Sequence, residues 1–201
     1  MKYNWLIFGL LLALGTSPLF SQTKKFKIHT VAFYNFENLF DTINDPDTFD
    51  EEWTPDGLQR WTKAKYQTKP HHLAQVLSEI GTPENKELPT FIGGCEIENR
   101  AVLEDLIQQS QLQEAEYGII HFDSPDKRGI DVALLYRKKW FRPTNLSSIP
   151  LYLNATPESE KTNTAASLAE KTEDDVPILA PTKRIYTRDQ LLVSGYLEGE
   201  E

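Results

Sequence analysis

Two carboxylates follow a short apolar segment near the middle of the chain. Residues 91–95 are apolar or small, Glu96 comes directly after them, and Glu98 lies two positions further on. Short apolar runs are typical of buried strands, and in sheets with helical crossovers ligands bind beyond the carboxyl ends of the strands. Glu96 is therefore predicted to lie where chemistry takes place. The alternative is that both acids belong to a solvated loop.

Several elements must position these acids. Asn99 is a typical helix cap, and a helix is expected over residues 101–109. The apolar side chains of residues 27–35 occupy both faces, which predicts a buried strand that ends at Asn35. Other elements are expected from apolar periodicity: a helix at residues 63–80 and strands at residues 117–122, 130–136 and 184–197.

Three polar segments connect or interrupt these elements. Residues 41–57 are acidic and rich in turn residues, and their spacing fits no EF-hand, so a solvated loop is favoured over a calcium site. Residues 123–129 form a polar turn that contains Arg128. Residues 154–181 are rich in Thr, Ser, Glu, Lys and Ala without apolar periodicity, which predicts a flexible excursion.

The composition limits the possible functions. A chain of 201 residues with 39% hydrophobic residues can form one globular domain with a sizeable core. Its formal charge of -9 argues against a nonspecific polyanion binder, because such binding needs clustered Lys and Arg. A phosphate substrate would therefore need a cation at the site. Cys95 is the only cysteine, so no intrachain disulfide can form, and its apolar flank predicts a core thiol.

The first 22 residues resemble a secretory signal. Lys2 precedes an apolar run at residues 5–14, and small or polar residues follow up to Gln22. We expect cleavage near Ser21 and export to the periplasm or the extracellular space, with no membrane span left after cleavage. A retained membrane anchor is the alternative, although the apolar run is short for a transmembrane helix. The domain would then comprise residues 23–201.

Three motifs together resemble the endonuclease/exonuclease/phosphatase family, whose members include deoxyribonuclease I. The motifs are VAFYNFENLFD at residues 31–41, CEIENR at 95–100 and KRGIDVALLY at 127–136. The resemblance implies a four-layered α/β sandwich, with two mixed sheets face to face and helices outside. It also implies an exported bacterial-type hydrolase that cuts phosphate esters, most closely an endonuclease, with Mg²⁺ or Mn²⁺ as cofactor.

The resemblance also implies roles for individual residues. Asn35 would be the amide beside the metal ion, and Glu96 its carboxylate ligand, so both would be catalytic and metal-binding. Arg128 would approach the substrate phosphate, and Asp131 would lie in the same substrate-binding region, either holding Arg128 in place or marking the strand edge. The partner is a phosphate-ester substrate, nucleic acid among the candidates; the oligomeric state is left open.

Two motifs of the family's second half are missing from the sequence: Gly-Asp-x-Asn and a terminal Ser-Asp-His. No histidine stands next in sequence to an acid that would orient it as a general base in the family's pattern. We therefore expect the amino-terminal part of a longer enzyme, with an incomplete sandwich. Two alternatives remain: a phosphatase or phospholipase-type phosphodiesterase of the same fold, or a catalytically inactive fragment.

Overall fold

The computed structural model describes residues 26–151, 153–155 and 183–198. The expected signal peptide at residues 1–22 and residues 156–181 of the expected excursion lie outside this described part. Asn154 and Ala155, which were expected to begin the excursion, belong instead to a short strand. The described residues contain mixed sheets and two α-helices, which confirms the α/β class.

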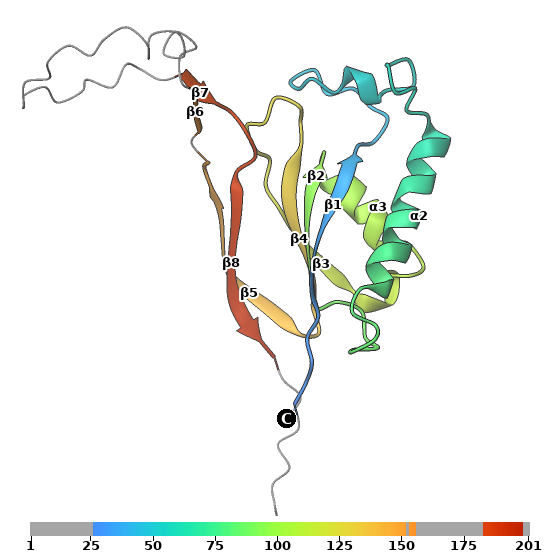
Figure 1. Ribbon diagram of the computed structural model, residues 1–201, viewed down its shortest axis with the longest axis vertical. Coiled ribbons are helices and arrows are strands. Elements are labelled where there is room, and N and C mark those ends of the chain that lie inside the picture. Colours follow the sequence, from blue (N-terminus) through green and yellow to red (C-terminus); the bar gives the residue numbers. More distant parts are fainter. Residues whose placement is uncertain (1–25, 152, 156–182, 199–201) are drawn as a thin grey trace, which may run out of the picture.

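A four-stranded mixed sheet forms the centre of the molecule, in the order β1-β2-β4-β3 (Figure 1). Strands β1 and β2 are parallel, whereas β4 is antiparallel to both β2 and β3. The parallel pair requires a crossover, and helix α2 lies between the two strands in sequence. The bounds are β1 Val31–Leu39, β2 Phe91–Ile97, β3 Tyr117–His121 and β4 Asp131–Arg137.

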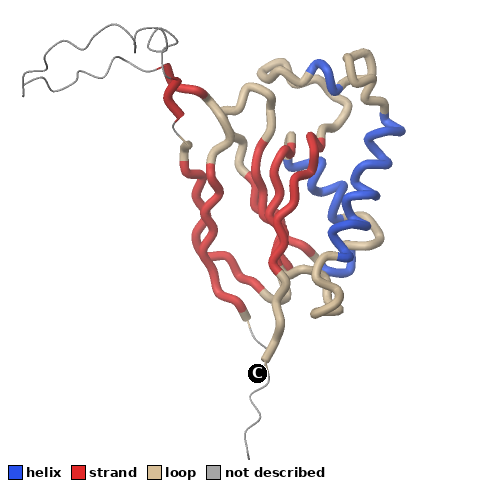
Figure 2. Tube along the Cα trace, in the orientation of Figure 1, coloured by secondary structure: helices blue, strands red, loops and turns tan. Residues whose placement is uncertain are grey.

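Two helices cover one face of this sheet (Figures 1 and 2). Helix α2 spans Lys63–Glu79 and α3 spans Arg100–Ile107. Each begins at a side-chain cap: the oxygens of Thr62 and Asn99 accept hydrogen bonds from backbone N–H groups of the first turn. Their apolar faces meet side chains from the sheet in one core, formed mainly by these buried residues: Ala32, Phe36, Leu39, Leu73, Leu77, Ile92, Ile97, Leu103, Leu106 and Leu135.

A two-stranded ribbon lies on the opposite side of the sheet (Figure 2). It consists of β5 at Phe141–Ile149 and β8 at Gln190–Leu197. The ring of Phe141 meets those of Phe91 and Tyr136, with centroids 4.9 Å and 5.6 Å away. The other short elements are β6 Leu153–Ala155, β7 Lys183–Ile185 and the 3-10 helices η1 Glu51–Trp53 and η2 Gln113–Ala115.

The ribbon leaves the β1 side of this face open. Val31 and Phe33 point away from the helices and are 71% and 72% exposed. The described residues therefore give a helical layer, a central sheet and a ribbon over part of the other face. The full four-layered sandwich stays a prediction.

Most expected elements are present, with shifted ends. The first strand begins at Val31 rather than residue 27 and continues past Asn35 to Leu39. Strand β5 was not anticipated, and the expected strand at residues 184–197 divides into β7 and β8. Pro70 lies inside α2 without ending it. These differences arise at strand ends and in ribbons, where tertiary pairing decides the structure more than local pattern does.

The cap of α3 gives a direct test of how this helix is held. The Asn99 side chain accepts a hydrogen bond from the Val102 N–H at 3.1 Å and donates one to Asp41 at 3.2 Å. Asn99→Ala should lower the free energy of unfolding by about 1 kcal/mol, because an orphan N–H loses its acceptor. Asn99→Ser keeps an acceptor and should lose less. Urea unfolding followed by circular dichroism measures both, and equal losses would contradict the capping role.

Candidate active site at the ends of β1 and β2

Asn35 and Glu96 come from neighbouring parallel strands. Asn35 is paired in register with Cys95, the residue directly before Glu96. Because β1 and β2 run in the same direction, both residues lie toward the carboxyl ends of their strands. The sheet therefore brings these two predicted residues to the same region. Their convergence on one cation stays a prediction.

The backbone is irregular where the two strands end. The register breaks after Asn35 in β1 and after Cys95 in β2. Glu96 has a φ of 63°, and Glu37 and Asn38 have φ values of 53° and 61°. Non-glycine residues in this left-handed region cost roughly 1–3 kcal/mol each and cluster at functional sites. Such bulges re-aim side chains, so the strained residue Glu96 is the one whose direction the bulge sets.

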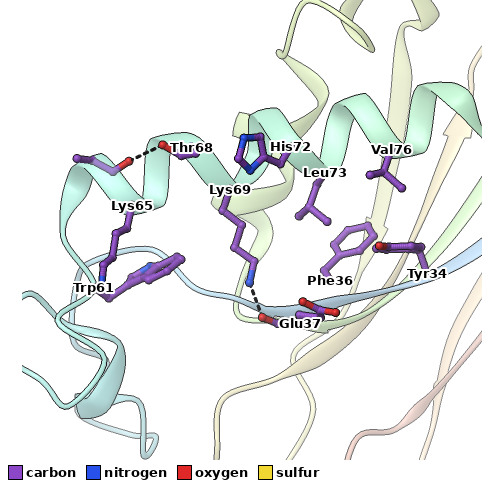
Figure 3. A pocket seen from close by; sticks show the side chains of 11 residues that line it. Tyr34, Phe36, Glu37, Trp61, Lys65, Thr68, Lys69, His72, Leu73 and Val76 are labelled. Atoms are coloured by element: carbon purple, nitrogen blue, oxygen red, sulfur yellow. Dashed lines mark hydrogen bonds between the residues drawn. The ribbon is translucent and has the colours of Figure 1, made fainter.

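Hydrogen bonds hold the strained end of β1. The side-chain oxygen of Asn35 accepts from the Glu37 N–H at 2.7 Å. The Lys69 ammonium group on α2 donates to the carbonyl oxygen of Glu37 (Figure 3) and also to that of Asn38. Burial lowers the pKa of Lys69 below its ordinary value, while the charges of Glu37 and Glu96 act to raise it. Lys69 therefore stabilises the turn after Asn35 and adds positive charge near Glu96.

A cavity of about 610 Å³ lies between β1 and α2, beside this lysine (Figure 3). Its lining is mainly apolar and aromatic, with Tyr34, Phe36, Trp61 and Leu73 among its residues. It touches the site only through Glu37 and Lys69, and it contains none of the site residues predicted from the sequence.

Two arginines from other segments approach Glu96. A guanidinium nitrogen of Arg188, just before β8, lies 3.8 Å from a carboxylate oxygen of Glu96. Arg128, in the loop between β3 and β4, has a raised pKa, mainly because of its hydrogen bonds to Asp126 and partly because of the Glu96 charge. Glu96 thus has one arginine 3.8 Å away and interacts electrostatically with Lys69 and Arg128, although the chain is acidic overall.

Asp126 is the residue that orients Arg128. Its two carboxylate oxygens accept from Nε and Nη2 of Arg128 at 3.0 Å and 2.8 Å. Burial opposes the ionisation of Asp126, yet Arg128 and Arg188 hold its pKa below the ordinary value. The Arg128 side chain is 60% exposed, so part of its guanidinium group faces solvent. A fixed and accessible guanidinium group is suited to binding a phosphate.

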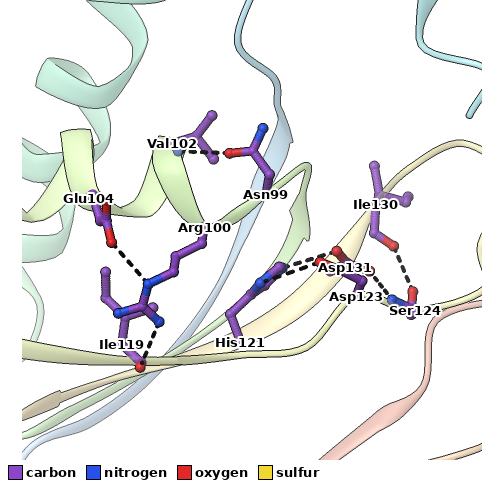
Figure 4. Close-up of polar contacts among 10 residues, drawn as sticks. All are labelled: Asn99, Arg100, Val102, Glu104, Ile119, His121, Asp123, Ser124, Ile130 and Asp131. Carbon is purple, nitrogen blue, oxygen red and sulfur yellow. Dashed lines mark hydrogen bonds and ion pairs between the residues drawn. The ribbon is translucent and has the colours of Figure 1, made fainter. Parts of the chain in front are cut away.

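Asp131 has different neighbours from those expected. Its side chain is 5% exposed and lies 3.0 Å from Nε2 of His121, and its other oxygen accepts from the Ser124 N–H at 2.8 Å (Figure 4). Asp131 is therefore not the carboxylate that holds Arg128. It is paired in register with Ile97, whose side chain lies in the core under the helices. Its contact with substrate stays a prediction.

The donors at the ends of β1 and β2 fit a hard divalent cation. The Glu96 carboxylate and the Asn35 amide offer oxygen atoms, which Mg²⁺ and Mn²⁺ prefer. The Asn35 oxygen already accepts one hydrogen bond, but an amide oxygen has two lone pairs. The guanidinium group 3.8 Å from Glu96 shows that this carboxylate already has a cationic neighbour. Cys95 offers no competing thiolate, because burial raises its pKa.

An acidic cavity of about 430 Å³ lies nearby, lined by Asp41, Glu98, Asp123 and Asp131 among others. Burial raises the pKa of Glu98 to about 8, and the charges of Asp41, Asp50 and Asp45 add to the effect. Glu98 is therefore protonated at neutral pH in the folded chain, unlike the solvated acid that was the sequence alternative.

The comparison with protein families agrees with this geometry. A family model described as Endonuclease/Exonuclease/phosphatase family matches residues 30–175. The chain belongs to this family. Members of this family hydrolyse phosphate esters with the help of divalent metal ions. The family therefore indicates a metal-dependent phosphoester hydrolase. No curated protein and no solved structure matches the chain. Among the described residues, neither helix is long and apolar enough to cross a membrane.

Sequence reasoning missed two basic residues of the region, Arg188 and Lys69, and the pairing of His121 with Asp131. Arg188 lies more than ninety positions from Glu96 in the sequence, and only the packing of the segment before β8 brings the two together. Lys69 was not singled out, because it lies within a segment that was predicted only as an amphipathic helix. The partner of His121 could have been found, because an antiparallel pairing of the two predicted strands around residues 123–129 places His121 close to Asp131.

The raised pKa of Glu98 predicts a pH-dependent stability in metal-free buffer. The folded chain keeps a proton on Glu98 that the unfolded chain releases above pH 4.5, so the free energy of unfolding falls from about pH 4.5 to about pH 8. Glu98→Gln removes this dependence. Its stability relative to the wild type should rise across that interval by about 1–3 kcal/mol, after allowance for solvent screening.

Urea unfolding at the two ends of the interval, with EDTA present, measures the effect. Glu104→Gln on the exposed face of α3 is the matched control and should follow the wild type. An identical pH dependence for Glu98→Gln and the wild type would contradict the assignment.

Proposed function

We propose that the chain is an exported, metal-dependent phosphodiester hydrolase of the endonuclease type, in which Glu96 and Asn35 hold Mg²⁺ or Mn²⁺. The observation that carries this proposal is the position of Glu96. It lies at a strained bulge beside the end of β1, with Arg188 at 3.8 Å, in a chain of the endonuclease/exonuclease/phosphatase family. The signal-like segment at residues 1–22 supports export.

In this proposal some residues bind the metal ion and others bind the substrate. A divalent ion, when bound, would polarise the phosphoryl group and lower the pKa of attacking water. The Glu96 carboxylate carries the charge that holds such an ion, and the Asn35 amide adds a neutral oxygen. The bulge fixes the direction of Glu96, and Lys69 fixes the turn that follows Asn35. A site held this way needs little reorganisation before the reaction.

Arg128 and Arg188 supply the phosphate-binding groups. Their guanidinium groups can donate paired hydrogen bonds to phosphate oxygens. They come from separate segments, the β3–β4 loop and the segment before β8, and Asp126 is close enough to both for each to lower its pKa. Two guanidinium groups that both lie near Asp126 can share the oxygens of one phosphate group. A nucleic-acid chain is the substrate that we propose, and a phosphomonoester or a phospholipid is the alternative.

The described residues place no histidine in contact with Glu96 or Asn35. The buried His121 lies on the helix-covered face of the sheet, since it is paired in register with the core residue Ala133. The proposal therefore assigns no general base within this part of the chain. Because losing an oriented base typically removes about 10²–10⁴-fold of rate, turnover by the chain alone is expected near background. Binding is the sharper test.

The proposal predicts metal-dependent binding of a phosphodiester chain. The full chain should bind a fluorescent DNA duplex with phosphorothioate linkages in Mn²⁺ and lose this binding in EDTA. Glu96→Gln should weaken binding about tenfold or more, because the ion loses its charged ligand. Arg188→Gln should weaken it by about 10–100-fold, the value of one charge-assisted hydrogen bond of roughly 1.5–3 kcal/mol. Fluorescence anisotropy at fixed salt measures each affinity.

Arg142→Gln is the matched control, because it removes the same charge from an exposed side chain at the opposite end of the β5–β8 ribbon from Arg188, where Arg142 pairs with Glu198. It should change the affinity by less than about twofold, as expected for a distant exposed charge. Competition by phosphomonoesters or phosphocholine vesicles, but not by unlabelled DNA, would favour the phosphatase or phospholipase alternative. DNA binding that persists in EDTA and in Glu96→Gln would contradict the proposal.

A further inference from the structure

We propose that His121 and Asp123 bind a second cation, a divalent transition-metal ion such as Zn²⁺, separate from the site at Glu96, and that Asp131 holds the imidazole in place for it. The three residues flank the loop between β3 and β4. One potential ligand atom from each lies within 4.8 Å of those from the other two. An imidazole nitrogen with carboxylate oxygens is a ligand set that suits zinc or manganese better than magnesium or calcium.

The distances fit coordination of one ion. Ligand atoms that each lie about 2.0–2.2 Å from a metal ion are separated from one another by about 3–4 Å. Nδ1 of His121 lies 3.9 Å from a carboxylate oxygen of Asp123, and Nε2 is held by Asp131 at 3.0 Å on the other side of the ring. The separation of Nδ1 from Asp123 is too long for a hydrogen bond but suits two ligands of one ion. Asp123 is 95% exposed, so its side chain can turn toward the imidazole.

His121 is a buried side chain with a nitrogen left over. Its side chain is 4% exposed, and Nε2 is engaged by Asp131. Nδ1 makes no hydrogen bond within the described part of the chain, and it is directed toward Asp123 (Figure 4). A carboxylate that binds one nitrogen of a histidine and leaves the other for a metal ion is a common arrangement around protein metal sites. Ser124 in turn fixes Asp131.

The two sites lie on different faces of the sheet. Asp131 is paired with Ile97 and His121 with Ala133, and both partners belong to the core under α2 and α3. Asn35 and its partner Cys95 lie on the other face, with the exposed Phe33. One ion therefore cannot use both sets of ligands. The acidic cavity lined by Asp123 and Asp131 gives a cation access to the second site.

An ion at this position would join the two ends of the β3–β4 loop. His121 is the last residue of β3, Asp131 is the first residue of β4, and Arg128 lies between them. A ligand that binds only the folded chain stabilises it, so the ion would hold this loop and the arginine that it presents. This role is structural and does not depend on the proposed hydrolase activity.

Calorimetric titration of the full chain with Zn²⁺ tests the proposal. The wild type should bind one ion whose affinity falls about tenfold or more in Asp123→Asn and in His121→Gln, since even changes behind a ligand commonly cost 10–100-fold. Asp123 is exposed, so Asp123→Asn keeps the test valid if His121→Gln does not fold. Glu96→Gln and the surface variant His71→Gln are the controls and should keep this ion.

Retention of the ion with unchanged affinity in Asp123→Asn would overturn the proposal, as would the absence of zinc binding in the wild type. Loss of the ion in Glu96→Gln but not in Asp123→Asn would place it at the other site and would equally overturn the proposal. Loss only in His71→Gln would identify a surface histidine as the ligand, with the same consequence.

Discussion

The parallel pairing of β1 with β2 is the constraint on which the rest of the structure depends. It aligns the ends of the two strands, so that the amide of Asn35 and the carboxylate of Glu96 enter the same region. The helices on one face supply the buried apolar surface that holds this pairing, because Phe36, Ile92 and Ile97 pack against α2 and α3. The strain at Glu96 and at the turn after Asn35 persists because this packed sheet determines the surrounding backbone.

Basic side chains act on Glu96 although the chain is acidic overall. The net charge of -9 would repel a polyanion, yet Arg188 lies 3.8 Å from Glu96, and the charges of Lys69 and Arg128 also interact with this carboxylate. Such local charges act over a Debye length of about 10 Å, so a phosphate at the site would meet these basic groups first. The acids are concentrated in the neighbouring cavity, where Glu98 is protonated. Asp123 lines this cavity and, with His121, is a proposed ligand of the second cation.

The sequence predicted the parts of this structure that depend on local pattern. The apolar run before Glu96, the cap at Asn99 and the periodicity of α2 each determine their own elements, and the family followed from three motifs. The contacts around the site depend on long-range packing, so the approach of Arg188 to Glu96 and the role of Asp126 could not be read from spacing. Strand β5 was missed because its residues are mostly exposed and carry little apolar alternation.

The central claim is that Glu96 and Asn35 share one hard cation. Crystals of the full chain soaked in Mn²⁺, with data collected for anomalous scattering, test it most directly. The account predicts a manganese peak about 2.0–2.4 Å from both a Glu96 carboxylate oxygen and the side-chain oxygen of Asn35. Side chains of Glu96 and Asn35 that point to different faces of the sheet, or manganese bound elsewhere with none between them, would contradict it.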